Sequence, residues 1–325
     1  MQYYMEYTLG WRGDSGKKAD KGTIVHKVLE LCALAKKALQ DGYATFEDHE
    51  IGEIETANYD PEYLDEIIDR VYEYYTSRTT HHDWKPLDLK HCRRWVWKIF
   101  NDDDGFFDPK NRTIVEAEPH FDFEIEEDWA AYEYELADGT KLKGNLALKG
   151  TIDLITDIGD GVYEIIDWKT GRRLDWATGK EKTQAKLQKD PQLRMYHLAC
   201  KKLYPEVETF LVTIHFMNDG GPFTLHFQDS DIPETLEMIK AKFNVIKNTK
   251  TPELRKSWKC SKLCPAGKTT YEGTDVDVMD NMFGAPLTKC EQTKIMIKEN
   301  GIEWVTANCM SPDHAIGKYK APGEV

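Results

Sequence analysis

Apolar residues recur with a helical period along the first part of the chain. Their spacing predicts helices over Thr23–Gln40, over residues 60–78 and over residues 86–100. Further along, apolar residues alternate or run together as in strands, at about 113–126, 141–158, 162–169, 208–217 and 222–228, with helices at 183–204 and 233–248. This order predicts an α/β protein with a central mixed β-sheet flanked by helices and a helical N-terminal elaboration.

Residues 150–171 are expected to form a β-hairpin with charged groups at matching positions. Two glycines flank Asp160 and favour a three-residue loop at the tip. A turn centred on Asp160 places Asp153 directly opposite Asp167, and period-two alternation puts Lys169 on the same face as Asp167. A turn shifted by one residue would instead flip one strand and separate the two carboxylates.

Two carboxylates and an ammonium on one patch of sheet suit a hard divalent cation. Such an ion lowers the pKa of bound water and offsets charge on a phosphate. The alternative is a solvated hairpin with ordinary surface charges. The apolar residues that flank the charged ones favour the cation site, because charged groups in a strand covered on both faces are costly unless paired.

Four motifs in order resemble the RecB-like branch of the PD-(D/E)XK nuclease superfamily, which includes phage and CRISPR-associated exonucleases. They span residues 21 to about 204, a little over half of the chain, and they are Lys21 to His26, Gly150 to Asp153, Asp167 to Gly171 and Gln192 to Tyr196. The resemblance implies a restriction-endonuclease-like core and hydrolysis of DNA that leaves 5′-phosphates, by an exonuclease of a phage or mobile element active in recombination or DNA processing.

The same resemblance assigns roles to individual residues. It implies that His26, Asp153, Asp167 and a neighbouring main-chain carbonyl bind Mg²⁺ or Mn²⁺, and that Lys169 is the catalytic lysine. An imidazole ligand fits Mn²⁺ better than a set made only of oxygen does. A lone histidine on such a helix is more often a packed or capping residue, but the place of His26 in the Gly22-x-x-x-His26 run ahead of the hairpin favours the ligand.

Gln192 and Tyr196 are implied to hold the DNA strand. They are four residues apart and therefore share a helix face, although Tyr196 could simply belong to the core. Glu116 and Glu118 precede the hairpin on a predicted strand. Either could assist the metal site, Glu118 being the better placed, or both could lie on an exposed strand face.

The net charge of −14 argues against a general nucleic-acid coat but not against a nuclease, in which only the groove must be positive. Basic residues that flank the motifs could line that groove: Lys17, Lys18, Lys21, Arg172, Arg173 and the run from Lys180 to Lys189. The chain has no run of 18 apolar residues and no secretory layout at its start, so a cytoplasmic protein without a membrane span is expected.

Four of the seven cysteines, Cys260, Cys264, Cys290 and Cys309, fall in the last quarter of the chain. Some RecB-like nucleases bind a [4Fe–4S] cluster through such cysteines, and four thiolates could also hold Zn²⁺. The spacings are irregular for either metal site, so free thiols are the alternative.

The pattern divides the chain into a nuclease domain over residues 1–250, with a helical insertion at about 55–105, and an irregular cysteine-containing appendage over residues 251–325. Helicase motifs are absent from the sequence, so a motor or recombinase would be a separate partner. Two other functions stay open: an inactive nuclease fold that binds DNA or acts as a scaffold, and a metal-dependent enzyme with another substrate. The oligomeric state cannot be predicted.

Overall fold

The computed structural model describes residues 1–13, 15–135, 141–175, 178–257, 259–260, 264–268 and 287–311. These residues belong to two compact units. One unit comprises Ser15–Tyr132 and Lys143–Phe243, and it contains the predicted nuclease motifs. The other comprises Met1–Asp14, Glu133–Leu142 and Asn244–Val325.

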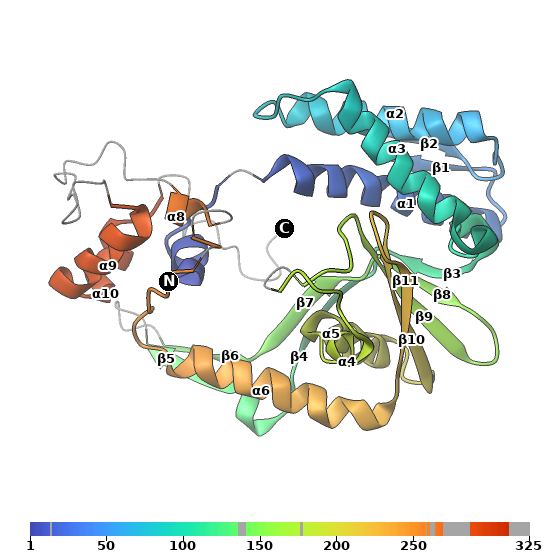
Figure 1. The fold of residues 1–325 in the computed structure, drawn as a ribbon. Coiled ribbons are helices and arrows are strands. Elements are labelled where there is room, and N and C mark those ends of the chain that lie inside the picture. Colours follow the sequence, from blue (N-terminus) through green and yellow to red (C-terminus); the bar gives the residue numbers. More distant parts are fainter. Residues whose placement is uncertain are drawn as a thin grey trace. The chain divides into compact units, whose positions relative to one another are not determined.

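A five-stranded mixed sheet forms the centre of the first unit (Figure 1). Its order is β11-β10-β9-β8-β3, in which β9 and β10 are parallel and the other neighbours are antiparallel. The strands are β3 (Thr113–Ala117), β8 (Leu154–Asp157), β9 (Val162–Lys169), β10 (Thr209–Phe216) and β11 (Gly221–Phe227). The expected α/β class with a mixed central sheet is confirmed.

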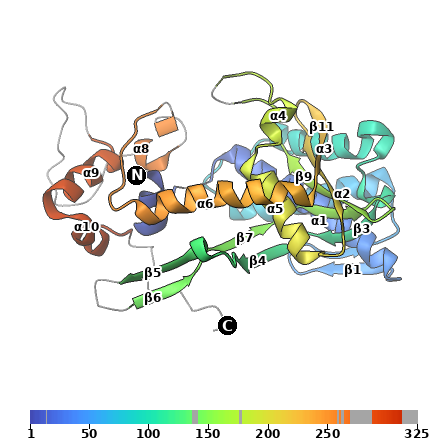
Figure 2. The ribbon, with the colours of Figure 1, turned by 90° about the horizontal axis from the view of Figure 1, so that it is seen from below.

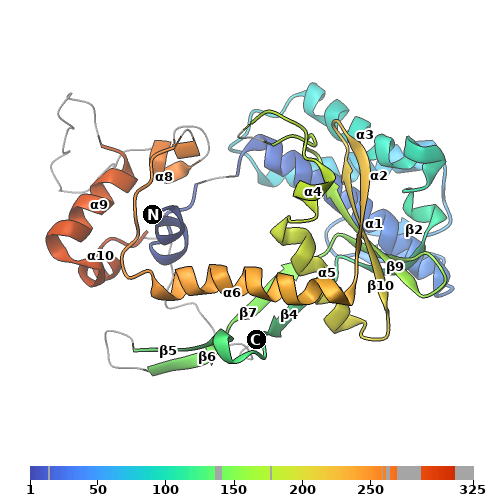
Figure 3. The ribbon, with the colours of Figure 1, turned by 60° about the horizontal axis from the view of Figure 1, so that its bottom comes forward.

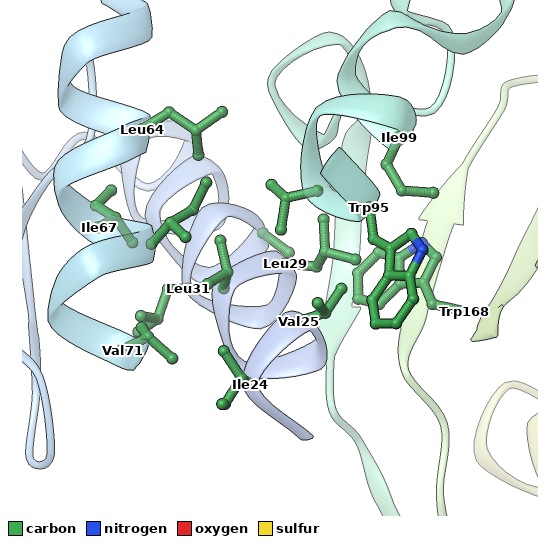
Figure 4. Close-up of a cluster of buried hydrophobic side chains, with 14 of the residues drawn as sticks. Ile24, Val25, Leu29, Leu31, Leu64, Ile67, Val71, Trp95, Ile99 and Trp168 are labelled. Carbon is green, nitrogen blue, oxygen red and sulfur yellow. The ribbon is translucent and has the colours of Figure 1, made fainter. Parts of the chain in front are cut away.

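Helices α1 (Lys17–Gln40) and α3 (Pro86–Asn101) cover one face of this sheet, and α2 (Pro61–Arg78) packs on α1 on the side away from the sheet. Figure 4 shows their apolar contacts, with Leu31 of α1 facing α2 and Leu29 facing α3 and the sheet. Trp168 of β9 is fully buried in this cluster. Helix α1 begins six residues before the predicted Thr23, because its first turns are tied to α3 through ion pairs of Lys17 and Lys21 with Asp88.

The opposite face of the sheet packs against α4 (Gln184–Leu187) and α5 (Pro191–Leu203), as Figure 3 shows. Leu193 of α5 shares a cluster with Ile165 of β9 and Val212 of β10. The first part of α6 (Ile232–Asn248) then packs on α5 through Ile239 and Leu198 (Figure 2). Alternate residues of β9 therefore face different helical layers.

Shorter elements surround the central sheet. Three two-stranded sheets pair β1 with β2, β4 with β7 and β5 with β6. Their strands are β1 (Thr45–Asp48), β2 (Gly52–Glu55), β4 (His120–Glu124), β5 (Ala131–Glu135), β6 (Lys141–Asn145) and β7 (Ala147–Thr151). Short helical turns are η2 (Asp102–Gly105), η3 (Pro109–Asn111), η4 (Asp128–Ala130) and η5 (Asp229–Asp231). The strand expected at 113–126 is divided into β3 and β4, and the one expected at 141–158 into β6, β7 and β8; the breaks between β3 and β4 and between β7 and β8 border the candidate site.

In the second unit, the start of the chain packs with the C-terminal helices. The elements are η1 (Tyr4–Thr8), α8 (Pro265–Lys268), α9 (Lys289–Asn300) and α10 (Ile302–Asn308). Met5 and Leu9 share an apolar cluster with Cys290 of α9 and Val305 of α10, and Ser311 N donates to Leu9 O over 2.7 Å. Among the helices of the described ranges, none has the length and apolar character that crossing a membrane requires.

Candidate active site

The hairpin of β8 and β9 has the register that the sequence predicted. Leu154 pairs with Ile166, which brings the preceding Asp153 opposite Asp167. The loop residues Gly159, Asp160 and Gly161 all have positive φ angles, as a three-residue loop around a left-handed centre requires. The alternative register, which would have separated the carboxylates, is thereby excluded.

Asp167 is a fully buried carboxylate that pairs with Lys169. The Lys169 Nζ atom donates a hydrogen bond of 2.7 Å to Asp167 Oδ1. Burial raises the pKa of Asp167 to about 6, with Lys169 opposing this shift and the negative charge of Asp153 adding to it. Both side chains lie on one side of β9, as strand alternation predicted, while Trp168 between them is buried on the other side against α1.

A second group gathers His26, Glu118 and Asp153. One donor atom from each side chain lies within 4.8 Å of the other two, and His26 Nδ1 is 3.5 Å from Asp153 Oδ1. Asp153 Oδ2 also accepts a 2.7 Å hydrogen bond from the main-chain N–H of Trp168, which fixes the carboxylate beside β9. Residues from helix α1, the end of β3 and the start of β8 thus meet at one point.

The electrostatics of this group favour a cation. Burial tends to lower the pKa of His26, but the hydrogen bond and negative charge of Asp153 outweigh it and the pKa is raised. Burial, with the charge of Asp153 adding to it, raises the pKa of Glu118 to about 8. Two carboxylates in a half-buried site repel each other unless a cation lies between them, and two oxygens with one imidazole nitrogen form a donor set that fits Mn²⁺ or Mg²⁺.

Glu118 is the site residue that the sequence favoured only weakly. It has a φ of +50°, unusual for a residue with a side chain, and its N–H donates to Asp153 O over 3.1 Å. This conformation and the following Pro119 end β3 and turn the Glu118 side chain toward His26. The predicted strand ran straight through the break, so only the Glu-Pro pair could have signalled it.

Gln192 and Tyr196 lie on α5, where Asp190 caps the first turn by accepting from Gln192 N over 3.0 Å. Gln192 Nε2 donates to Tyr196 Oη over 2.7 Å and lies 3.4 Å from Asp167 Oδ1. Gln192 therefore approaches the Asp167 carboxylate from α5, the helix on the sheet face opposite to α1. Tyr196 is also buried in the core on that face, so the packing role considered for it from the sequence applies as well.

The predicted residues are divided between two hollows that share His26. One is lined by Glu118 and Asp153, and the other by Asp167, Lys169 and Gln192. Asp167 is not part of the tight group of three donor atoms, although Asp153 is opposite it in the sheet. The third donor of that group is Glu118, and the metal-binding role of Asp167 stays a prediction.

Gly150, in the motif that leads to Asp153, allows β7 to lie close to Phe121 of β4. A Cβ atom on Gly150 would lie 2.5 Å from Cζ of Phe121, the residue paired with it across β4 and β7. Any larger residue would push β7 away from β4 and move the chain that enters Asp153.

Several of the predicted groove cations are engaged in ion pairs. Lys17 and Lys21 bind Asp88, and Arg173 lies 2.9 Å from Glu181. Arg172 and Lys182 line the hollow that holds Asp167. Fewer of the predicted basic residues are therefore available to line the groove than the sequence suggested.

The C-terminal cysteines lie in the other unit, and none of Cys260, Cys264, Cys290 and Cys309 forms a disulfide. Cys260, Cys264 and Cys290 line one hollow, whereas Cys309 Sγ contacts Met296 Sδ at 3.9 Å. Among the described residues, no three cysteine sulfurs lie within 4.8 Å of one another. A [4Fe–4S] or Zn²⁺ site at these cysteines stays a prediction.

The chain is similar to solved structures at low sequence identity. A crystal structure of a candidate exonuclease from Eubacterium rectale is 14% identical, over 84% of this chain and 83% of that chain, with a TM-score of 0.43. The structure of the protein SSO0001 is 15% identical, over 73% of this chain and 81% of that chain, with a TM-score of 0.24. No curated protein matches the chain significantly.

The family comparison extends over most of the sequence. The model of the PD-(D/E)XK nuclease superfamily matches residues 1–268, and this range includes all four motifs and every side chain of the candidate active site. The chain therefore belongs to the PD-(D/E)XK nuclease superfamily.

Proposed function

We propose that this nuclease hydrolyses DNA phosphodiester bonds with Mg²⁺ or Mn²⁺, acts as an exonuclease and leaves 5′-phosphates. The observation that carries the proposal is the meeting of His26, Glu118 and Asp153 beside the Asp167–Lys169 pair. Three side chains that can ligate a metal and a lysine, gathered beside the inner strands β8 and β9, supply what phosphodiester hydrolysis requires.

His26, Glu118 and Asp153 would hold the metal ion, and Asp167 would contribute from the neighbouring hollow. When bound, the ion supplies an acidified water and offsets negative charge on the phosphate. The hydrogen bond from Trp168 N to Asp153 prepares this carboxylate to bind the ion, because it fixes the carboxylate before any ion arrives.

Lys169 would act at the phosphate. Its ammonium is held 2.7 Å from Asp167 while the side chain remains 38% exposed, so the charge is fixed in direction but open to substrate. Such a prearranged cation stabilises charge that develops on non-bridging oxygens during the reaction. Gln192 would position the strand through its amide, since Tyr196 orients that amide from the next helical turn.

We propose DNA as the substrate, and exonucleolytic cleavage as the mode, from the sequence motifs and not from an observed contact with DNA. The motif of Gln192 and Tyr196 is typical of RecB-like nucleases, and a setting in phage or mobile-element DNA processing, with a separate motor or recombinase, would suit such a chain. An inactive scaffold with this fold would have no need for the buried carboxylate of Asp167, whose burial is costly without a function.

The test is cleavage of end-labelled DNA with Mg²⁺, Mn²⁺ or EDTA by the whole chain and its variants. Asp153→Ala, Asp167→Ala and Lys169→Ala should each lower the rate by roughly 10²-fold or more, because each removes a part of the charge stabilisation. The matched controls are Asp122→Ala and Lys149→Ala, which carry the same changes in an exposed ion pair between β4 and β7.

A covalently closed circle distinguishes the mode of cleavage. We expect linear DNA to be degraded and the circle to survive, with 5′-phosphates on the products. Equal cleavage of the circle would overturn the exonuclease assignment. Activity in EDTA, or full activity in the aspartate variants, would overturn the metal-dependent mechanism and leave only membership of the family.

A further inference from the structure

The described residues contain a second group of metal-ligating side chains, formed by Asp20, His81 and His82. Asp20 lies in the first turns of α1, and the two histidines lie in the connection between α2 and α3. One donor atom from each side chain lies within 4.8 Å of the other two. None of the three residues belongs to the four nuclease motifs.

We propose that Asp20, His81 and His82 bind a transition-metal ion of the Zn²⁺ type, separate from the nuclease metal. Two imidazoles and one carboxylate are a donor set that Zn²⁺ accepts readily, whereas Mg²⁺ and Ca²⁺ prefer oxygen alone. A water molecule would complete a four-coordinate site.

The distances suit one ion between the three groups. Asp20 Oδ2 is 2.6 Å from His82 Nε2 and 3.8 Å from His81 Nε2. Donor atoms about 2.0–2.1 Å from a tetrahedral Zn²⁺ are about 3.3 Å from each other, which lies between these two values. Each of these two separations would therefore change by less than 1 Å when the ion binds.

An ion pair between Asp20 and His82 alone would explain less of this arrangement. It leaves no reason for the ring of His81 to lie 4.0 Å from that of His82, directed at the same carboxylate. Neighbouring residues in an extended chain point to opposite sides, so a turn is required to bring both rings together. A shared ion gives both imidazoles a role, since each binds through one nitrogen.

Neighbouring side chains shield Asp20, His81 and His82 from solvent but leave them accessible to an ion. The side chains of Asp20 and His82 are 13% and 12% exposed, and that of His81 is 36% exposed, which leaves a route for the ion. The edge of Trp84 packs on His82 with ring centroids 5.4 Å apart. The nearby cation of Lys17 is already paired with Asp88 at 2.5 Å, so its repulsion of a bound ion is reduced.

The site would fasten the α2–α3 connection to the start of α1. Asp20 precedes His26 on α1 by six residues, or about 9 Å along the helix axis. An ion here would thus restrain the helix that supplies the imidazole of the candidate active site. Its role would be structural, because no substrate-binding residue lies among its ligands.

The experiment measures Zn²⁺ and Co²⁺ binding to the whole chain. His81→Ala and Asp20→Asn are the main variants, since the first changes a partly exposed ring and the second preserves shape; His82→Ala is the third. His49→Ala is the matched control, because His49 is 86% exposed and outside the group. Any ion at the nuclease site is present in all these proteins, so only differences between them are diagnostic.

We expect the wild type and His49→Ala to bind one more Zn²⁺ per chain than the three variants, or to bind it at least tenfold more tightly. Co²⁺ should give them the strong visible bands of a tetrahedral site, and Zn²⁺ should raise their Tm by several degrees more. The same stoichiometry, affinity and Co²⁺ spectrum in His81→Ala and Asp20→Asn as in the wild type would overturn the proposal. An Asp153→Ala variant that keeps the Co²⁺ spectrum separates this result from the nuclease mechanism.

Discussion

Replacing Glu118 by glutamine tests the residue that links the fold to the proposed metal site. The change removes one negative charge from a group whose donor atoms lie within 4.8 Å of one another. With an effective dielectric constant of about 20, a divalent ion about 4 Å away loses roughly 8 kcal/mol of attraction. The pKa of Glu118 is raised to about 8, so at pH 7 the ion must also displace a proton from Glu118, at a cost of about 1.4 kcal/mol that glutamine does not carry.

The difference of roughly 7 kcal/mol is an upper limit, because the amide oxygen of glutamine still offers a weaker ligand. We therefore expect Mn²⁺ to bind roughly 10²- to 10³-fold less tightly by titration calorimetry, and cleavage to need correspondingly more Mg²⁺. Glu116→Gln is the matched control, since it removes the same charge from an exposed residue on the same strand that accepts from Tyr204. Equal metal affinities in the two variants would refute the reasoning.

Three further changes test the surroundings of the site. Gln192→Ala should raise KM several-fold more than it lowers kcat on a short DNA strand; the opposite split would show a role in the chemical step. Arg112→Met leaves the buried carboxylate of Glu164 without its ion pair, and urea unfolding should show a loss of about 3–5 kcal/mol, largely recovered when Glu164→Gln is added. Gly150→Ala should lower stability by about 1–3 kcal/mol through overpacking, whereas Gly171→Ala, with no atom within 4 Å of the added carbon, should be nearly neutral in the same assay.

The register of the catalytic hairpin was predictable because it depends on local information. The residues around Asp160 fix the loop, and strand alternation then fixes the relation of Asp153 to Asp167 and of Asp167 to Lys169. The mixed sheet followed from the same kind of pattern, since apolar runs separated by turn residues mark strands wherever they pair. These features require no knowledge of distant contacts.

Features that depend on distant contacts were not predictable in the same way. The early start of α1 reflects ion pairs of Lys17 and Lys21 with Asp88, almost seventy residues away. The group of Asp20 with His81 and His82 likewise joins segments about sixty residues apart. Glu118 is an intermediate case. The strand break that turns it toward His26 depends on the local sequence, whereas its partners His26 and Asp153 are distant in the sequence.

Trp168 explains why the charged residues of β9 can be arranged so closely. Its side chain is fully buried against α1 and its ring lies edge-on to His26, with centroids 6.3 Å apart. Its main-chain N–H holds Asp153, and its two neighbours along the strand, Asp167 and Lys169, must point to the opposite side. Packing one large apolar side chain therefore fixes the helix that carries the imidazole, the hydrogen-bonded carboxylate and the carboxylate–lysine pair together. Because these positions share one anchor, the site depends on the core beneath it as directly as on its own charges.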